Sequence, residues 1–418
     1  MTTSFASDIT IDPARWPDVA TVPRQRLRRA VTRRLVRRML ADVPVVVTTS
    51  GGERLGAGRP GDPAMHITDP DALYARIGTQ GLIGFGEAYM AGEWTATDLS
   101  GVLTVLAQRL ANLVPAPLQR LRAVVLPRRP PSDANTPVGA RRNIQRHYDL
   151  SNDLFSLFLD PTMTYSSAMF DDGCELAPQD LHEAQVRKIE RLLDATGVGA
   201  GCSVLEIGTG WGELAVRAAA RGATVTTITL SLEQALLARR RIEDAGYADR
   251  VEVRLQDYRE VTGSFDAVLS VEMLEAVGAD HWDEYFAGAE RLLAPGGRFG
   301  IQAITMAHDR MLATANTYTW ILKYIFPGGQ VPSPEAIERS AGRAHLHVES
   351  AFEFGQHYAE TLRRWREAFE AAGEDVETLG FDAVFHRMWS LYLAYSEAGF
   401  RSGYLDVAQL VLTRRSAA

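Results

Sequence analysis

The sequence predicts an α/β fold whose core is a doubly wound, mostly parallel sheet. Short apolar segments alternate with helical patterns from about residue 141 onward, as they do in proteins with parallel sheets. In addition, the apolar segment 203–207 runs into a glycine-rich turn, and a helical pattern follows at 213–221. Such a turn lets a ligand approach the backbone, because side chains are missing where they would collide. The turn glycines are Gly208, Gly210 and Gly212.

Three parts follow one another along the chain. Residues 1–110 mix helical patterns with a small strand region near 45–47 and predict a smaller N-terminal α+β domain. Residues 111–140 are rich in proline and arginine and predict a linker. Residues 141–418 form the main domain, in which 305–400 is expected to be a helical insertion that serves as a lid or pocket wall. The expected strands are 203–207, 224–229, 251–255, 266–270, 298–304 and about 404–413.

The composition excludes several classes of protein. No uninterrupted apolar run in the 418 residues reaches the roughly 20 residues of a transmembrane helix. Residues 1–12 lack the basic start and apolar segment of a signal peptide, so we expect a cytoplasmic protein. Cys174 and Cys202 predict neither a disulfide framework nor a metal site. The histidines without metal-ligand spacing are His308, His345, His347 and His386.

Positive charge is concentrated in residues 24–38, although the net charge of the chain is -8. This segment is rich in arginine and contains no acidic residue. A basic amphipathic helix suits an anionic membrane surface, which predicts a peripheral protein on the inner face of the cell membrane. The alternative is a helix docked on its own domain with a solvated arginine face. Nucleic acid is not expected, because the remaining chain is acidic. Apolar residues recur at helical spacing at Leu27, Val31, Leu35 and Met39.

The residues of the glycine turn favour a cationic, nucleoside-like ligand. The spacing E-x-G-x-G-x-G differs from the G-x-G-x-x-G of dinucleotide-binding proteins. Glu206 also stands just before the glycines, where a phosphate-binding turn would avoid a carboxylate. S-adenosylmethionine fits both observations. The alternative is an ordinary strand, turn and helix with incidental glycines.

Polar residues at the ends of the next two strands extend this cofactor site. Thr229, Leu230 and Gln234 follow the second strand, where an acidic residue usually binds ribose hydroxyls. Thr229 and Gln234 offer neutral hydrogen bonds instead. After the third strand, Asp257 and Tyr258 supply a carboxylate and an aromatic face suited to the amine and ring of adenine. Because ligands bind at the carboxyl ends of parallel strands, the joint placement predicts a nucleoside-type cofactor.

Several motifs occur in an order that resembles one known family. HYDLSNDLF, DPTMTYSSAMF, VLEIGTGWG, TLSLEQ, KYIFPGG and GYLDVAQLVL follow one another within residues 141–413. In this respect the chain resembles the cyclopropane-fatty-acid synthase family of S-adenosylmethionine-dependent lipid methyltransferases. The resemblance implies a Rossmann-like class I methyltransferase fold and methylation of a cis double bond in an acyl chain of a phospholipid. We also expect Tyr165 and Ser166 of the second motif to contact the cofactor.

The same resemblance implies a catalytic site. In the family, a bound bicarbonate removes a proton from the newly added methyl group. It is held by a glutamate, an isoleucine backbone, a tyrosine, a cysteine position and a histidine position. The glutamate, isoleucine and tyrosine fall on Glu275, Ile304 and Tyr392, whereas the cysteine and histidine positions are Ser167 and Gln302.

The two departures bear on the reaction product. The hydroxyl of Ser167 and the amide of Gln302 can both donate hydrogen bonds to an anion, so bicarbonate is still expected. Gln302 does not titrate near neutral pH as histidine does. We therefore favour an exocyclic methylene product, 10-methylene-stearoyl, which a separate reductase would convert to a 10-methyl branch. A cyclopropane product is the alternative.

Other classes of function stay open. A methyltransferase for a small soluble amine or hydroxyl would need no basic helix. A catalytically inactive lipid-binding subunit would retain the fold, but the cofactor residues are intact. A nicotinamide oxidoreductase disagrees with the glycine spacing. Resemblance to the longer family members predicts a homodimer.

Overall fold

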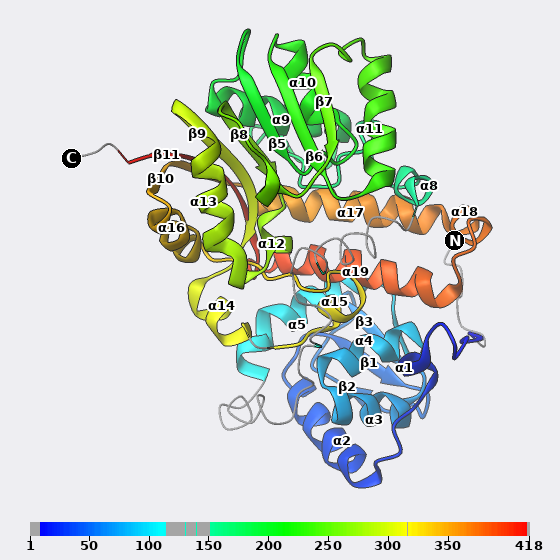
Figure 1. Cartoon of the computed structure of the whole chain (residues 1–418). Helices are drawn as coiled ribbons and strands as arrows, with labels where there is room; N and C mark the ends of the chain where they lie inside the picture. The colour runs from blue at the N-terminus through cyan, green and yellow to red at the C-terminus, as the bar shows by residue number, and fades with distance from the viewer. Residues whose placement is uncertain (1–8, 114–129, 131–138, 140–150, 316, 416–418) are drawn as a thin grey trace. The chain divides into compact units, whose positions relative to one another are not determined.

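The chain forms two compact units that are interleaved in sequence. The computed structural model in Figure 1 describes residues 9–113, 130, 139, 151–315 and 317–415. The predicted division at residues 110 and 140 stays a prediction, because most of the expected linker lies outside the described residues. Unit 1 comprises Met1–Arg129, Asn316–Ile325 and Trp365–Tyr404, and unit 2 comprises Pro130–Ala315, Phe326–Arg364 and Leu405–Ala418.

Unit 2 is built on a seven-stranded sheet of order β10-β11-β9-β8-β5-β6-β7. The pairs that join β9, β8, β5, β6 and β7 are parallel, whereas β11 is antiparallel to both β9 and β10. The α/β class with a mostly parallel sheet is therefore confirmed. The strands are β5 (Ser203–Ile207), β6 (Thr224–Thr229), β7 (Val251–Leu255), β8 (Phe265–Val271), β9 (Leu293–Thr305), β10 (Leu346–Glu353) and β11 (Asp406–Arg414).

Helices cover both faces of this sheet (Figure 1). Alternate residues of a strand point to opposite faces, so Val204 packs with α9, α10 and α11, whereas Leu205 and Ile207 pack with α12, α13 and α16. The helices are α8 (Asn152–Ser156), α9 (Leu181–Thr196), α10 (Glu213–Ala220), α11 (Leu232–Asp244), α12 (Leu274–Val277), α13 (Trp282–Leu292), α14 (His308–Thr314), α16 (Pro334–Arg343) and the first part of α17 (Gly355–Ala371), with the short 3-10 helices η2 (Tyr258–Glu260) and η3 (Ala279–His281).

The predicted strands agree with the structure, but the expectation for 305–400 was wrong in one respect. That segment contains β10 as well as helices. Most side chains of β10 are exposed, since it forms one edge of the sheet. An edge strand with one solvated face lacks the continuous apolar run by which the central strands are recognised, so its sequence gives a weak signal.

Unit 1 combines a small sheet with helices. Its four strands lie in the order β2-β1-β3-β4, with β1 and β3 parallel. The α+β character expected for residues 1–110 is present in the described part. The elements are α1 (Pro17–Ala20), α2 (Arg26–Leu40), β1 (Val46–Thr49), β2 (Arg54–Leu55), β3 (Ala64–Ile67), α3 (Pro70–Gln80), α4 (Leu82–Met90), β4 (Trp94–Ala96), α5 (Leu99–Leu113), α15 (Trp320–Tyr324), the end of α17, α18 (Gly373–Thr378) and α19 (Ala383–Arg401).

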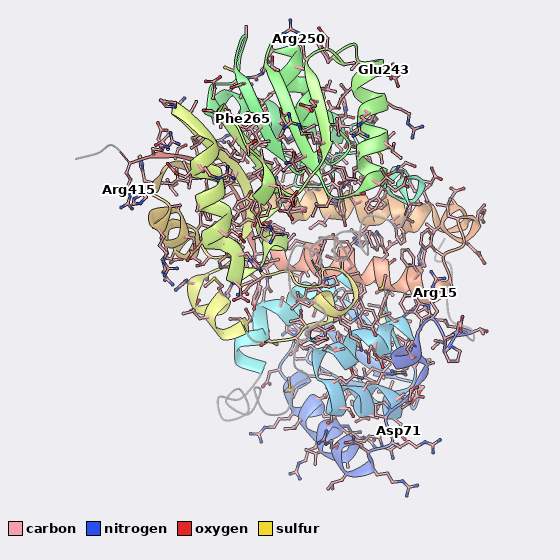
Figure 2. All side chains as sticks on the ribbon, in the orientation of Figure 1. Arg15, Asp71, Glu243, Arg250, Phe265 and Arg415 are labelled. Atoms are coloured by element: carbon pink, nitrogen blue, oxygen red, sulfur yellow. The ribbon has the colours of Figure 1, made fainter. Side chains whose placement is uncertain are left out.

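Helix α2 turns its predicted apolar stripe away from unit 1. Leu27, Val31 and Leu35 are 80%, 54% and 37% exposed, whereas Thr32 and Leu40 are buried. Arg29 pairs at 3.1 Å with Asp71 of α3, which is labelled in Figure 2. The helix thus docks through a different face from the one that its apolar spacing defines. No described helix is both long and apolar enough to cross a membrane.

Helix α15, which carries part of the KYIFPGG motif, packs on α4 within unit 1. A Cβ on Gly86 would lie only 2.4 Å from the Trp320 ring, so this position requires glycine. Lys323 and Tyr324 both donate to Glu87, at 2.5 and 2.9 Å. Trp320 and Tyr324 therefore have a clear structural role in unit 1.

Candidate active site

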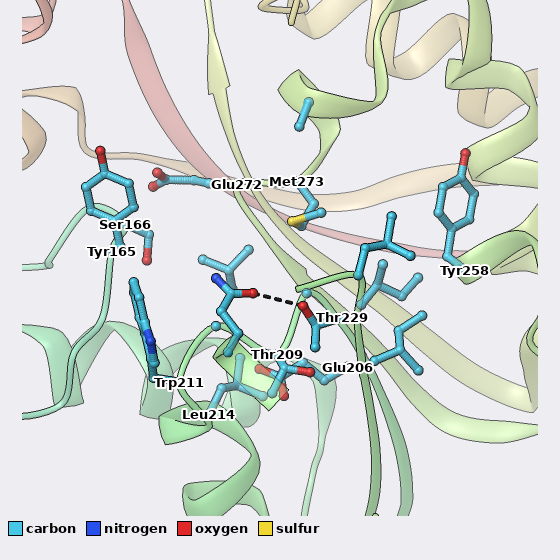
Figure 3. A pocket seen from close by; sticks show the side chains of 18 of the residues that line it. Tyr165, Ser166, Glu206, Thr209, Trp211, Leu214, Thr229, Tyr258, Glu272 and Met273 are labelled. Carbon is cyan, nitrogen blue, oxygen red and sulfur yellow. Dashed lines mark hydrogen bonds between the residues drawn. The ribbon is translucent and has the colours of Figure 1, made fainter. Parts of the chain in front are cut away.

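A pocket of unit 2 lies where the parallel strands end at their carboxyl side (Figure 3). It is lined by the ends of β5, β6 and β8, by the segments that follow them and β7, and by residues 162–166. This is the edge at which ligands bind in open α/β sheets. The pocket therefore coincides with the predicted cofactor site.

The glycine turn after β5 adopts a backbone that requires glycine. Gly208, Gly210 and Gly212 have φ of 98°, 51° and 95°, in the region that residues with a Cβ rarely adopt. A Cβ on Gly208 would also lie 2.8 Å from the Met273 sulfur. Gly212 then leads directly into α10, which begins at Glu213. The turn thus places Gly208 and Gly210 in the pocket lining.

Glu206 is buried at this turn and lines the pocket. The Thr227 hydroxyl donates to its Oε2 at 2.6 Å. Burial raises the pKa of Glu206 to about 8, while Thr227 and the positive charge of Lys188 oppose this rise. A cationic ligand would favour the ionised form of Glu206, so this carboxyl suits a positively charged partner.

The predicted residues after β6 and β7 also line the pocket. The Thr229 hydroxyl donates to Gln234 Oε1 at 2.8 Å, which ties the strand end to α11. Arg259 donates to both Asp257 oxygens, at 2.9 and 2.7 Å, and holds this carboxylate in place. Burial raises the pKa of the Tyr258 phenol above its usual value. Leu230 belongs to the same lining.

Tyr165 and Ser166 form part of the opposite wall, together with Trp211 (Figure 3). The rings of Tyr165 and Trp211 each lie 5.1 Å from the Phe155 ring. Lys188 of α9 donates to Ser166 Oγ at 2.6 Å, and burial lowers the pKa of this lysine to about 8. Lys188 is therefore a pocket residue that the sequence analysis did not single out.

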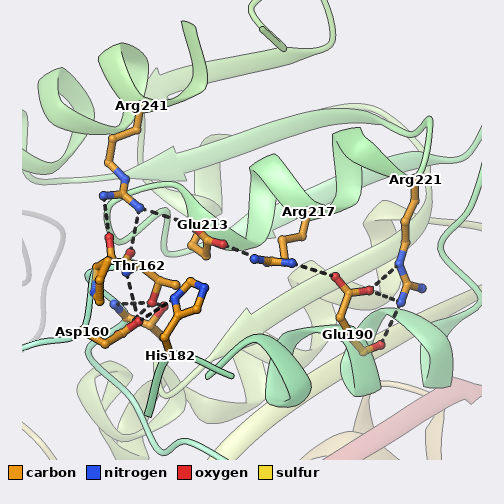
Figure 4. A network of polar contacts seen from close by, with 10 residues as sticks. Asp160, Thr162, His182, Glu190, Glu213, Arg217, Arg221 and Arg241 are labelled. Carbon is orange, nitrogen blue, oxygen red and sulfur yellow. Dashed lines mark hydrogen bonds and ion pairs between the residues drawn. The ribbon is translucent and has the colours of Figure 1, made fainter. Parts of the chain in front are cut away.

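A polar network behind the turn fixes the wall relative to the helices (Figure 4). Glu213, the first residue of α10, accepts from Arg217 at 2.8 Å and from Arg241 at 3.2 Å. Arg241 also donates to the carbonyls of Pro161 and Thr162 at 3.1 Å. Because one guanidinium joins α10, α11 and the DPTMTYSS segment, it holds that segment against the glycine turn.

A second cluster centres on Glu272, which follows β8. Its backbone has φ of 52°, an uncommon value for a residue other than glycine. Its carboxylate accepts from the Ser167 backbone at 2.8 Å, from Gln302 Nε2 at 2.8 Å and from the Tyr358 hydroxyl at 2.6 Å. Glu272 lines the pocket, so this cluster adjoins the cofactor site.

Glu275, one turn further along the chain, has different surroundings. The Ile304 backbone N–H donates to its Oε1, whereas its buried Oε2 has no hydrogen-bond partner among the described residues. Burial, followed by the negative charge of Glu272, raises its pKa to about 8. The carboxyl therefore carries a proton near neutral pH, and one buried oxygen is left for an external group.

Among the residues that the structure describes, the predicted catalytic ones therefore do not form a single hydrogen-bonded cluster. Ser167 and Gln302 meet at Glu272, whereas Ile304 meets Glu275. The Ser167 hydroxyl donates to the Ala168 carbonyl at 3.0 Å. Tyr392 lies in α19 of unit 1, where it is buried 5.1 Å from the Trp389 ring.

Glu272 and Tyr358 are the residues whose part in the site the sequence analysis missed. Glu272 stands three positions before Glu275 in the sequence. The available signal for Glu272 was its closeness in the sequence to a second acidic residue, Glu275. The part played by Tyr358 depends on a contact made by α17, which no local pattern reveals. No group of three metal-ligating side chains occurs in the described part of the chain.

Comparisons with known proteins agree with this geometry. The family model described as mycolic acid cyclopropane synthetase matches residues 136–410. The chain is 54% identical to "Tuberculostearic acid methyltransferase UfaA1" of Mycobacterium tuberculosis, over 99% of this chain and 98% of that protein. It is 34% identical to the cyclopropane-fatty-acyl-phospholipid synthase of Escherichia coli, over 84% and 87% of the two chains.

A solved structure gives the same result. The mycolic acid cyclopropane synthase CmaA1 complexed with SAH and CTAB is 31% identical, with a TM-score of 0.60 over 65% of this chain and 97% of that one. The expected Rossmann-like class I fold is thereby confirmed. This chain belongs to the mycolic acid cyclopropane synthetase family.

Proposed function

We propose that the chain is an S-adenosylmethionine-dependent C-methyltransferase that acts on the cis double bond of an unsaturated, oleoyl-type acyl chain in a phospholipid. The observation that carries the proposal is the position of Glu272 in the lining of the glycine-turn pocket, three residues before Glu275 with its unpartnered oxygen. Similarity over the full length to a tuberculostearic acid methyltransferase supports the same conclusion.

The pocket residues fit S-adenosylmethionine as the methyl donor. A turn of three glycines leaves room for the ligand beside the backbone. Glu206, Glu272 and Asp257 place carboxyl groups in the lining, and these suit the ammonium, the sulfonium and the hydrogen-bond donors of this cofactor. Tyr165, Trp211 and Tyr258 supply aromatic faces, which attract cations.

The reaction begins when an alkene carbon attacks the sulfonium methyl carbon. The new C–C bond uses the π electrons, the S–CH3 bond breaks, and its electron pair leaves with S-adenosylhomocysteine. The neighbouring carbon becomes a carbocation, which water would quench. Exclusion of water is therefore required, and the buried carboxylate of Glu272 stabilises positive charge that develops near it.

The fate of this cation decides the product. If a hydride shifts onto the cationic carbon, the charge moves to the methylated carbon, and loss of a methyl proton gives an exocyclic methylene. If the proton leaves first, the ring closes to a cyclopropane. We propose the methylene, 10-methylene-stearoyl, because of the similarity to a tuberculostearic acid methyltransferase. Tuberculostearic acid is a 10-methyl branched acid, so a separate reductase must supply two further hydrogens.

Bicarbonate fits this chain at Glu275. The protonated Glu275 carboxyl has an O–H to donate to an anion, and its Oε2 has no other described partner. The Ile304 backbone N–H donates to Oε1 of this carboxyl and holds it in place. When bound there, bicarbonate would supply the base that accepts the methyl proton. Ser167, Gln302 and Ile304 all direct their donors to protein acceptors, so we assign the anion to Glu275.

The product can be tested in cells that lack endogenous methylated lipids. The chain is expressed in bacteria fed oleate, and the extracted phospholipids are examined by proton NMR. We expect vinylidene signals. Intact mass does not distinguish the two products, because both add one CH2. Ring-proton signals would assign the cyclopropane synthase reaction instead, and unmodified oleoyl chains would contradict the proposed function.

We also propose that α2 binds the anionic inner face of the cell membrane. Its outward stripe of Leu27, Val31 and Leu35 is exposed and surrounded by arginines, as in helices that lie in the membrane interface. Binding to vesicles with phosphatidylglycerol should fall at least tenfold when the three stripe residues become serine. Unchanged vesicle binding would contradict this proposal. Loss of a dimer in sedimentation would instead assign the stripe to contact with a second copy of the chain.

A further inference from the structure

A chain of side-chain hydrogen bonds runs through the sheet of unit 2 and ends on Glu272. It begins at Arg191 of α9, whose guanidinium donates to Gln409 Oε1 at 2.8 Å. Gln409 Nε2 donates to Gln302 Oε1 at 3.1 Å, and Gln302 Nε2 donates to Glu272 Oε1 at 2.8 Å. Gln409 and Gln302 pair directly across β11 and β9, and both are at most 2% exposed.

The direction of this chain is fixed by chemistry. A guanidinium has donors only, so the Gln409 carbonyl must face Arg191 and its amide nitrogen must face the other way. That nitrogen also donates to the Lys188 carbonyl at 2.9 Å. Gln302 must therefore turn its own carbonyl toward Gln409 and its nitrogen toward Glu272. The Arg191 end is itself held 4.0 Å above the Phe352 ring.

We propose that Gln409, with Arg191 behind it, is a positioning residue that directs the Gln302 amide so that Glu272 is held as a hydrogen-bond acceptor beside the sulfonium. The inference rests on the proposed function, which supplies the cation. Burial raises the pKa of Glu272, and the three donors that its carboxylate then receives oppose this rise. If the Gln302 side-chain amide were flipped, its carbonyl oxygen would face the Glu272 carboxylate and repel it.

Two substitutions of Gln409 separate this role from a packing role. Gln409→Glu keeps an acceptor for Arg191 but has no amide N–H for Gln302, so the Gln302 nitrogen turns toward the new carboxylate and its carbonyl faces Glu272. Gln409→Met has a similar length and no polar group, so Gln302 can keep its bonds to Glu272 and to the Ser167 carbonyl. If Gln409 only packs against its neighbours, Gln409→Glu should keep more activity than Gln409→Met, because only the glutamate retains the contact with Arg191.

We expect kcat to fall at least 20-fold in Gln409→Glu and less than fivefold in Gln409→Met, with KM for S-adenosylmethionine within twofold in both. Both variants should lose thermal stability, Gln409→Met because Arg191 loses its acceptor and Gln409→Glu because its carboxylate faces the Lys188 carbonyl. In a Gln302→Met background, Gln409→Glu should lower kcat less than threefold, because the reversed amide is gone. Activity losses that follow the loss of stability would overturn the proposal.

A readout without turnover keeps this test separate from the proposed function. In protein labelled with ¹⁵N-glutamine, the Gln302 side-chain resonance should move in Gln409→Glu and stay in place in Gln409→Met. Equal displacement in both variants would overturn the positioning role. If the wild-type protein methylates no acyl chain while this resonance behaves as expected, the proposed function fails and the hydrogen-bond chain stands.

Discussion

The two halves of the pocket are built in different ways. The cofactor half is contiguous, because Glu206 and the three glycines lie within seven residues of β5 and its turn. The carboxylate half is assembled from distant segments, because Ser167, Gln302 and Tyr358 reach Glu272 from other parts of the chain. This difference suggests that binding and chemistry can be damaged separately, and each substitution below tests that separation.

The largest effect is expected for Gly208→Val in the cofactor half. The position has φ of 98°, and a Cβ there would collide with Met273, so a β-branched residue must distort the turn. We expect affinity for S-adenosylmethionine to fall more than 100-fold in calorimetry, with no detectable turnover. Gly246→Val is a matched control, since this glycine also has positive φ but has open space around its Cβ. Comparable affinity losses in both variants would show that backbone strain alone explains the effect.

Glu275→Gln should impair turnover without impairing cofactor binding. The amide keeps the size of the side chain but has neither the acidic proton nor the charge of the carboxyl group. We expect turnover to fall at least 100-fold, while affinity for S-adenosylmethionine stays within threefold, because Glu275 is not among the residues that line the cofactor pocket. A variant with full turnover would show that the base site lies elsewhere.

The sequence predicted the cofactor half of the pocket better than the carboxylate half. The strands β5 to β9 and the glycine turn were predictable, because apolar periodicity and glycine are local signals. The surroundings of Glu272 were not, because its partners Gln302 and Tyr358 reach it only through the pairing of β8 with β9 and the packing of α17. The resemblance assigned Ser167 and Gln302 to one anion site with Glu275; in the structure both donate to Glu272, and the anion site stays a prediction.

Glu272→Gln tests whether that carboxylate is needed as an anion. Glu272 accepts three hydrogen bonds, and an amide has one oxygen, so at least one of its donors would face the new NH2 group. We expect kcat to fall about 10- to 100-fold, with a lower melting temperature. Tyr358→Phe removes one donor and keeps the charge, and should lower kcat less than tenfold. If the two variants lose the same activity, the hydrogen bonds and not the charge explain the effect.

The smallest effect concerns stability, and it compares Glu275 with Glu206. Burial raises the pKa of each to about 8, from the ordinary value of 4.5. Below about pH 4.5 both the folded and the unfolded chain hold the proton. Above it the unfolded chain releases the proton while the folded chain keeps it, so stability falls as pH rises from about 4.5 to about 8.

Urea unfolding midpoints at pH 5.5 and pH 8.5 measure this fall. We expect Glu275→Gln to reduce the difference between the two midpoints, because the amide does not titrate. Glu206→Gln should reduce it by a similar amount, because the pKa of both carboxyls is raised to about 8. A reduction in only one of the two variants would mean that only that carboxyl resists ionisation in the folded chain.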